Sequence, residues 1–399
     1  MKNIRFVAFV LMITTLLTSL SFSISANNLI TDSDEITLFP ALSLSFVEDN
    51  ISSLIDISEL QRIAQRRNIN FVPQDYDVKQ LTDFNGYTYY IVEFSPIGYA
   101  IYDNRFTHIL EFNAKAISPY HDRTEELFYA GAGEYYIKSN TLDDVYIHPI
   151  SGYSFADDTD TELYFKEQSS NISSAVNLKA TSILSIDSNA SQINATASTS
   201  YASLSKYSVI TSVDTTNFNV CGNCGYVAGS LIVWYHYKVL GWTDFVPGGT
   251  ITSALARDIQ GDRGPATYGP DLQEALSAWS YSHGAVEEGG WQETLPALLD
   301  VLPTASKIYN LIDDDRPVAL LGLTPPQSDL DPSGTNSLNN ISGTTGSVEH
   351  VITITGVDKV TNSIIDVDYY YYAHFGWTPS YNDIYISDSS LTKGAIVYY

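Results

Sequence analysis

Three apolar-rich runs in the first half of the chain are separated by turn residues and predict a small antiparallel sheet. The runs cover residues 87–94, 98–102 and 108–112, with Ser, Pro, Gly, Asp and Asn between them. Ahead of them, Ser58 opens a capping-box sequence, and Leu60, Ile63 and Ala64 follow at helical spacing, which predicts a short helix ending near Arg67. We therefore expect a helix packed on a sheet in this region.

A different pattern governs the second half, where long apolar stretches recur at helical intervals. Apolar residues follow Cys224 so closely that the pattern predicts a buried helix whose first turn holds Cys224. Further helices are predicted at 270–279 and 295–302. The β-branched run after His350 predicts a strand that begins at this histidine, and the run 364–374 predicts another.

Two segments of distinct composition divide the chain. Residues 1–26 combine a basic start, a short apolar run and small residues at the exit, which is typical of a secretory signal peptide. A retained membrane anchor is the alternative, disfavoured because threonines and a serine interrupt the run early. Residues 168–200 are small and polar and predict a linker. The expected organisation is thus a signal peptide, an N-terminal region 27–167, a linker 168–200 and a C-terminal region 201–399.

The charge of the chain limits its partners. It carries 46 Asp and Glu against 20 Lys and Arg, a net charge of −26. Nucleic acid is an unfavourable partner, because binding to it relies on basic residues that neutralise phosphates. The apolar content of 44% is enough for large cores, and two cysteines are too few for a disulfide framework. We expect an exported, soluble, globular protein without membrane contact once the signal peptide is removed.

The chemistry is concentrated at three places. Both cysteines, Cys221 and Cys224, lie at the start of the predicted apolar helix. A thiolate there faces unpaired N–H groups and the positive end of the helix dipole, which lower its pKa and make it a usable nucleophile. His350 opens one predicted strand and His374 closes the next, so a thiol, an imidazole and a polar orienting group are expected to meet. A buried structural cysteine is the alternative for Cys224.

The segment Cys221-Gly-Asn-Cys224 and the helix after it resemble the nucleophile segment of the papain superfamily of cysteine peptidases. The His350 strand and the sequence His374-Phe-Gly-Trp377 resemble the later segments of its streptopain-like branch, and the helix also resembles bacterial leader-peptidase-like relatives. The resemblance implies an α+β fold, a papain-like catalytic domain with a helical half and an antiparallel sheet half. It also implies a secreted bacterial proenzyme acting on protein or peptide substrates, with residues 27–167 as a small α+β propeptide that inhibits the enzyme.

The same resemblance assigns roles to residues. Cys224 would be the nucleophile and His350 the general base and acid. The family has an asparagine that orients the catalytic histidine, and His374 stands in its place here; Asp366 and Asn382 are alternatives. The family also has a glutamine that donates to the oxyanion, and Asn219 is the amide we prefer for this role, together with the backbone N–H of Cys224.

Two other functions are compatible with the sequence. A relative that has lost catalysis would keep the scaffold as an extracellular binding protein, and the Cys221–Cys224 pair would suit a thiol–disulfide oxidoreductase. No cofactor is expected. A metal site is not expected either, because the nearest histidines, His236 and His283, lack ligand spacing to the cysteines.

Overall fold

The structure is a computed structural model that describes residues 41–141, 145–150, 154–156, 166, 169–170, 172–174, 198–215, 224–241, 253–263, 269–283, 290–293, 301–322, 350–361, 367–376, 379–391 and 393–398. All of them belong to one compact unit, Pro40–Tyr399. The predicted signal peptide lies outside the described residues. Among the described helices, none is long and apolar enough to cross a membrane.

Among the described residues, the elements before the predicted linker are two helices and eight strands. They are α2 (Leu44–Leu54), α3 (Ile57–Gln65), β1 (Asp75–Thr82), β2 (Thr88–Ser95), β3 (Tyr99–Tyr102), β4 (Ile109–Asn113), β5 (Leu127–Tyr129), β6 (Tyr135–Lys138), β7 (Val145–Ile147) and β8 (Ser154–Ala156). The predicted helix is α3 and the three predicted strands are β2, β3 and β4. The helix begins slightly earlier than expected, because Asp56 rather than Ser58 caps it by accepting a bond from Glu59 N at 3.1 Å.

The later elements include those that carry the candidate chemistry. They are β9 (Ser198–Ser203), α5 (Ser208–Thr211), α6 (Cys224–Leu240), α7 (Ser253–Gln260), α8 (Gly269–Ser282), β10 (Gly290–Glu293), α9 (Val301–Asp313), β11 (Val318–Gly322), β12 (His350–Thr361), β13 (Val367–His374), η4 (Pro379–Tyr381), β14 (Ile384–Ser387), η5 (Asp388–Ser390) and β15 (Lys393–Tyr398). As predicted, α6 begins at Cys224, β12 begins at His350 and β13 ends at His374.

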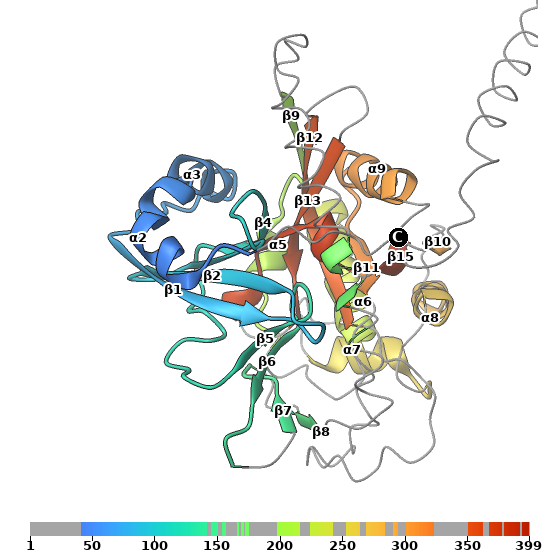
Figure 1. Ribbon diagram of the computed structural model, residues 1–399. Coiled ribbons are helices and arrows are strands. Elements are labelled where there is room, and N and C mark those ends of the chain that lie inside the picture. Colours follow the sequence, from blue (N-terminus) through green and yellow to red (C-terminus); the bar gives the residue numbers. More distant parts are fainter. Residues whose placement is uncertain are drawn as a thin grey trace, which may run out of the picture. The chain divides into compact units, whose positions relative to one another are not determined.

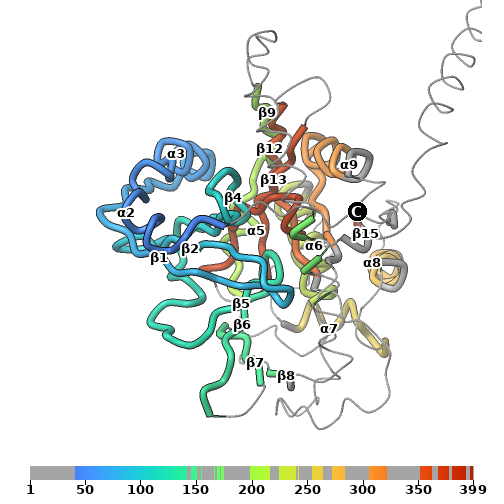
Figure 2. Tube along the Cα trace, viewed as in Figure 1, coloured from blue at the N-terminus to red at the C-terminus, as the bar shows by residue number. Residues whose placement is uncertain are grey.

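The described strands form one sheet with the order β10-β15-β11-β12-β13-β14-β4-β3-β2-β1-β5-β6-β7-β8. Every pairing is antiparallel except that of β1 with β5, so the fold is α+β with a mostly antiparallel sheet, as expected at this coarse level. On one edge of β12, β11 pairs with its first half and β9 with its second half. Figure 1 shows β12 and β13 near the middle of this arrangement, and Figure 2 shows α2, α3, β1 and β2, in blue, to their left.

Helix α6 is buried because apolar residues cover its whole circumference: Tyr226 to His236 are all buried. It packs on β11 and β12, and Gly229 lets it approach α8 closely. A Cβ at that position would lie 3.1 Å from Leu276 Cδ2, tighter than ordinary packing. The residue that opens α6 is therefore held by a rigid element.

The hydrophobic cores do not separate at the predicted linker. The main core joins Tyr89 and Tyr99 of the N-terminal strands to Leu231 and Ile354, and a second core joins α2 and α3 to Tyr372 and Tyr385. Parts of the predicted linker itself are packed: Ile172 is in the main core and residues 198–200 belong to β9. Regions before and after residues 175–197 thus share both cores.

Candidate functional site

Cys224 is the first residue of the 17-residue helix α6. It is partly exposed, packs against the main core and is a thiol rather than half of a disulfide. The first turn of α6 contains no Asp or Glu. Backbone N–H groups and the helix dipole at this end favour negative charge, so the position suits a thiolate.

His374 is the last residue of β13, and both nitrogens of its ring make hydrogen bonds. Its Nε2 lies 3.2 Å from Val213 O, and the backbone N–H of Gly376 donates to Nδ1 at 2.9 Å. These partners fix a neutral tautomer with the proton on Nε2, since a carbonyl only accepts and an N–H only donates. Burial lowers the pKa of His374 to about 4, so the ring is neutral at neutral pH.

The carbonyl of Val213 is a shared anchor in the chain segment that precedes Cys224. Besides His374, it accepts a bond from Asn382 Nδ2 at 2.7 Å, and the same amide nitrogen lies 3.2 Å from Thr211 O. Asn382 is 3% exposed, and its Oδ1 is buried without a hydrogen-bond partner among the described residues. Two side chains, one at the end of β13 and one in the turn before β14, therefore hold Val213 in place.

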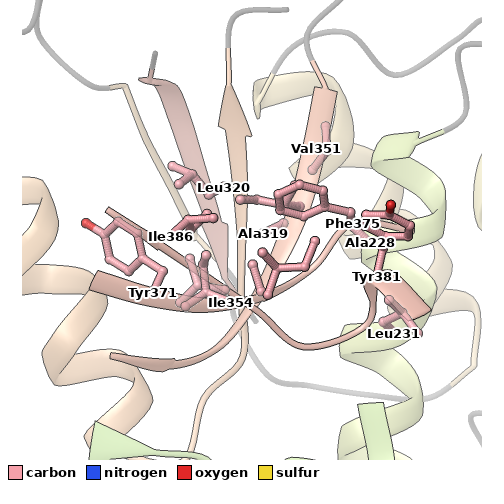
Figure 3. Packing of buried hydrophobic residues seen from close by; sticks show 14 of the residues in the cluster. Ala228, Leu231, Ala319, Leu320, Val351, Ile354, Tyr371, Phe375, Tyr381 and Ile386 are labelled. Carbon is pink, nitrogen blue, oxygen red and sulfur yellow. The ribbon is translucent and has the colours of Figure 1, made fainter. Parts of the chain in front are cut away.

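The turn after His374 lies against the first turn of α6. Gly376 has a φ of +74°, a conformation that glycine adopts without strain, and a Cβ there would lie 3.4 Å from Val227 Cγ1. Figure 3 shows Phe375 beside Ala228 of α6, with Val351 from the start of β12 close by. The start of α6, the start of β12 and the end of β13 thus lie near one another.

His350 is placed only by its backbone. It pairs with Gly322 of β11, and Thr353 rather than His350 stands opposite His374 in the ladder between β12 and β13. The side chain of His350, and all of Asn219, Cys221 and Asp366, lie outside the described residues. The prediction that His374 orients His350 stays a prediction; the contacts that the structure shows for His374 go to Val213 and Gly376.

The N-terminal region reaches the neighbouring turn at 380–383. Asn113 Nδ2 donates to Ser380 O at 2.9 Å, and Tyr381 OH donates to Ile117 O at 3.2 Å. Asp383, the residue after Asn382, is buried, and burial raises its pKa while Arg67 and Lys115 act to lower it. One face of the turn that positions Asn382 is therefore built by residues before the predicted linker.

Sequence reasoning missed the anchor at Val213 and gave Asn382 only as an alternative orienting group. A backbone carbonyl carries no signal in the sequence, so Val213 was not detectable. The polar pair Asn382-Asp383, between the aromatic residue Tyr381 and the apolar strand β14, is the signal that could have marked the turn.

No protein-family model matches this sequence, and a search of curated proteins finds no match either. Within the described part of the chain, no group of three or more His, Cys, Asp or Glu side chains could hold a metal ion. The function must therefore be argued from the site itself.

Proposed function

We propose that this protein is an exported cysteine peptidase with Cys224 as its nucleophile and His350 as its general base and acid. The observation that carries the proposal is the position of Cys224: a partly exposed thiol on the first residue of a buried helix whose first turn lies against the turn after β13. A structural cysteine would need neither the exposure nor the helix start. The motif resemblance to papain-like peptidases supports the same assignment.

The proposed reaction has two steps. His350 takes the thiol proton of Cys224, the sulfur attacks the peptide carbonyl, and the proton passes to the leaving amine as the C–N bond breaks. Water then attacks the resulting thioester while His350 takes its proton; the C–S bond breaks, the carboxylic acid product leaves, and the proton returns to the sulfur. The backbone N–H of Cys224 and the amide of Asn219 would stabilise the oxyanion in both steps.

His374 and Asn382 would support this chemistry by positioning the backbone. Because both bond to Val213 O, they fix the chain at Val213, upstream of Cys224. A neutral His374 also adds no positive charge to the site, so it would not oppose protonation of His350 when that residue takes the thiol proton.

The direct test compares three proteins on a fluorescent casein under reducing conditions: the mature chain, Cys224→Ala and Cys221→Ala. We expect Cys224→Ala to lose about 10³-fold or more of the activity, because the nucleophile is gone. Cys221→Ala is the matched control and should keep the activity. Equal activity in all three proteins would refute Cys224 as the nucleophile, and an inactive mature chain would point to a binding protein. Disulfide reductase activity that needs both cysteines would instead favour an oxidoreductase.

A further inference from the structure

We propose that residues 41–174 are a permanent part of the fold and stay bound to residues 198–398 when the chain is cut between them. The proenzyme expected from the resemblance would release this region. The structure instead joins it to the rest of the molecule through the sheet, through buried arginines and through a polar seam. This inference does not depend on the proposed function.

The first link is the sheet itself. Strand β4, before the linker, pairs antiparallel with β14, after it, with Phe112 opposite Tyr385 and Glu111 opposite Ile386. Releasing the N-terminal region would leave β14 as an edge strand and would expose the aromatic residues that it covers. Tyr372 and Tyr385, both buried, belong to the core that otherwise consists mainly of residues from α2, α3 and β1–β4.

The second link is a pair of arginines at the end of α3. The side chain of Arg67 is 1% exposed, pairs with Asp383 at 3.2 Å and donates to Thr355 Oγ1 at 2.8 Å. Its guanidinium also lies over the rings of Tyr207 and Tyr372, 4.3 Å and 4.1 Å from their centroids. All four partners lie after the linker.

Arg66 makes the neighbouring ion pair with Asp358 of β12, whose side chain is fully buried. Releasing the N-terminal region would take Arg66 from Asp358 and both Arg67 and Lys115 from Asp383, and the loss of a buried ionic partner is far more costly than the exposure of a surface charge. The pairs are also shielded from solvent, so salt should weaken them little. These two arginines therefore act against release.

The third link is a polar seam around His108, just before β4. Its Nε2 lies 2.8 Å from Ser387 Oγ, and its Nδ1 lies 3.2 Å from Tyr370 OH. Ser390 Oγ donates to Leu110 O at 3.1 Å, across the same seam. Buried polar groups that satisfy one another in this way would each lose a partner on separation.

These links must overcome a general repulsion, since both sides of the linker carry more acidic than basic residues. The arginines of α3 place positive charge where the other side presents Asp358 and Asp383. The interface is thus complementary in charge although the two parts as a whole are both negative.

The experiment uses the mature full chain with Cys224→Ala, so that self-cleavage cannot interfere. A recognition sequence for a site-specific protease is inserted between residues 180 and 190, the chain is cut completely, and the product is run on size exclusion at about 1 µM. We expect both fragments to co-elute at the size of the uncut chain, which requires a Kd below roughly that concentration. Fragments that elute separately, or that precipitate, would overturn the proposal.

A matched pair of variants tests the arginine contribution in the cut protein. Arg67→Met should raise the Kd of the two fragments at least about tenfold, because Asp383 loses a buried partner. Arg123→Met is the control, since the ion pair of Arg123 with Glu125 lies within the N-terminal region and should leave the Kd unchanged. Equal Kd values for the two variants would refute the role of Arg67. Co-elution of the cut parent protein answers the main question even if Arg67→Met does not fold, and no readout depends on catalysis.

Discussion

The two halves of strand β12 make opposite use of polar groups. The first half, 350–354, pairs with β11 and lies beside the end of β13, where His374 is neutral and, among the described residues, bonds to backbone groups. The second half, 356–361, pairs with β9 and receives a charged group, the guanidinium of Arg66 on Asp358. One strand thus carries a neutral end near the candidate nucleophile and a charged end at the N-terminal region.

This difference has a physical reason. A thiolate–imidazole site works through proton transfers, and a fixed buried charge beside it would shift the protonation states of both groups. Buried ion pairs are better suited to holding two parts of a fold in one arrangement, because removing one partner leaves the other charge uncompensated. The comparison suggests that the second half of β12 fixes the strand while the first half serves the site.

The largest effect is expected in the charged half. Asp358→Asn should destabilise the protein by about 4 kcal/mol, because Arg66 keeps its charge and loses the buried carboxylate that balances it. Urea unfolding followed by fluorescence measures the change. Glu48→Gln, at an exposed position of α2, is the control and should change stability by less than about 0.5 kcal/mol. A loss of under about 1 kcal/mol in Asp358→Asn would show that the charged half does not hold the strand.

The stability that His374 contributes beside the neutral half of β12 should depend on pH. His374→Phe removes two buried hydrogen bonds and should cost about 2 kcal/mol near neutral pH. The pKa of His374 is lowered from 6.5 to about 4, so its contribution to stability is complete above pH 6.5 and is lost as the pH falls toward 4. The phenylalanine variant lacks this loss. The stability gap between the two proteins should therefore shrink, or reverse, between pH 6.5 and 4.

Unfolding both proteins in urea across that range provides the measurement. His148, whose pKa burial also lowers to about 4, is present in both proteins, so its effect cancels in the difference. A gap that stays constant with pH would mean that His374 does not have the lowered pKa and that the first half of β12 is not the neutral end.

The parts of this arrangement that were predictable from the sequence are those with a strong local pattern. The apolar residues after Cys224 predicted α6, and the β-branched run after His350 predicted β12, because a helix period and a strand run are visible within a dozen residues. The placement of both residues at element starts followed directly. The α+β class was expected from the family resemblance, and the structure agrees with it at this coarse level.

The ion pairs between residues that are distant in sequence were not predictable. Arg66 and Asp358 are far apart in sequence, and nothing local to either residue names its partner. The composition of 168–200 predicted a linker, but its last residues belong to a strand: Ser198–Ser203 is small and polar and forms β9. The hydrogen bonds between strands come from the backbone, and Ser and Thr can supply them as other residues do. Composition alone cannot separate a linker from a polar edge strand.

At Gly356, in the charged half of β12, there is room for only a hydrogen atom as the side chain. Its substitution should cost less stability than Asp358→Asn. A Cβ at Gly356 would lie 2.6 Å from Arg67 Nη2 and 3.2 Å from Tyr372 Cδ2, so Gly356→Ala must displace the guanidinium. We expect a loss of about 2 kcal/mol. In an Arg67→Met background the added penalty should be clearly smaller, because the two positions are in contact. Additive losses in a double-mutant cycle measured in urea would argue against this close packing.

The smallest loss of stability is expected for the exposed one of the two cationic partners of Asp383. Asp383 pairs with Arg67, which is buried, and with Lys115 at 3.8 Å, whose side chain is 46% exposed. An exposed ammonium is screened by solvent and keeps its hydration, so Lys115→Met should cost less than about 1 kcal/mol. Adding salt should change the stability of the parent more than that of Lys115→Met, since the exposed pair is the one that ions can screen. If Lys115→Met proved as costly as Asp358→Asn, burial would not be what distinguishes the charges that hold β12 in place.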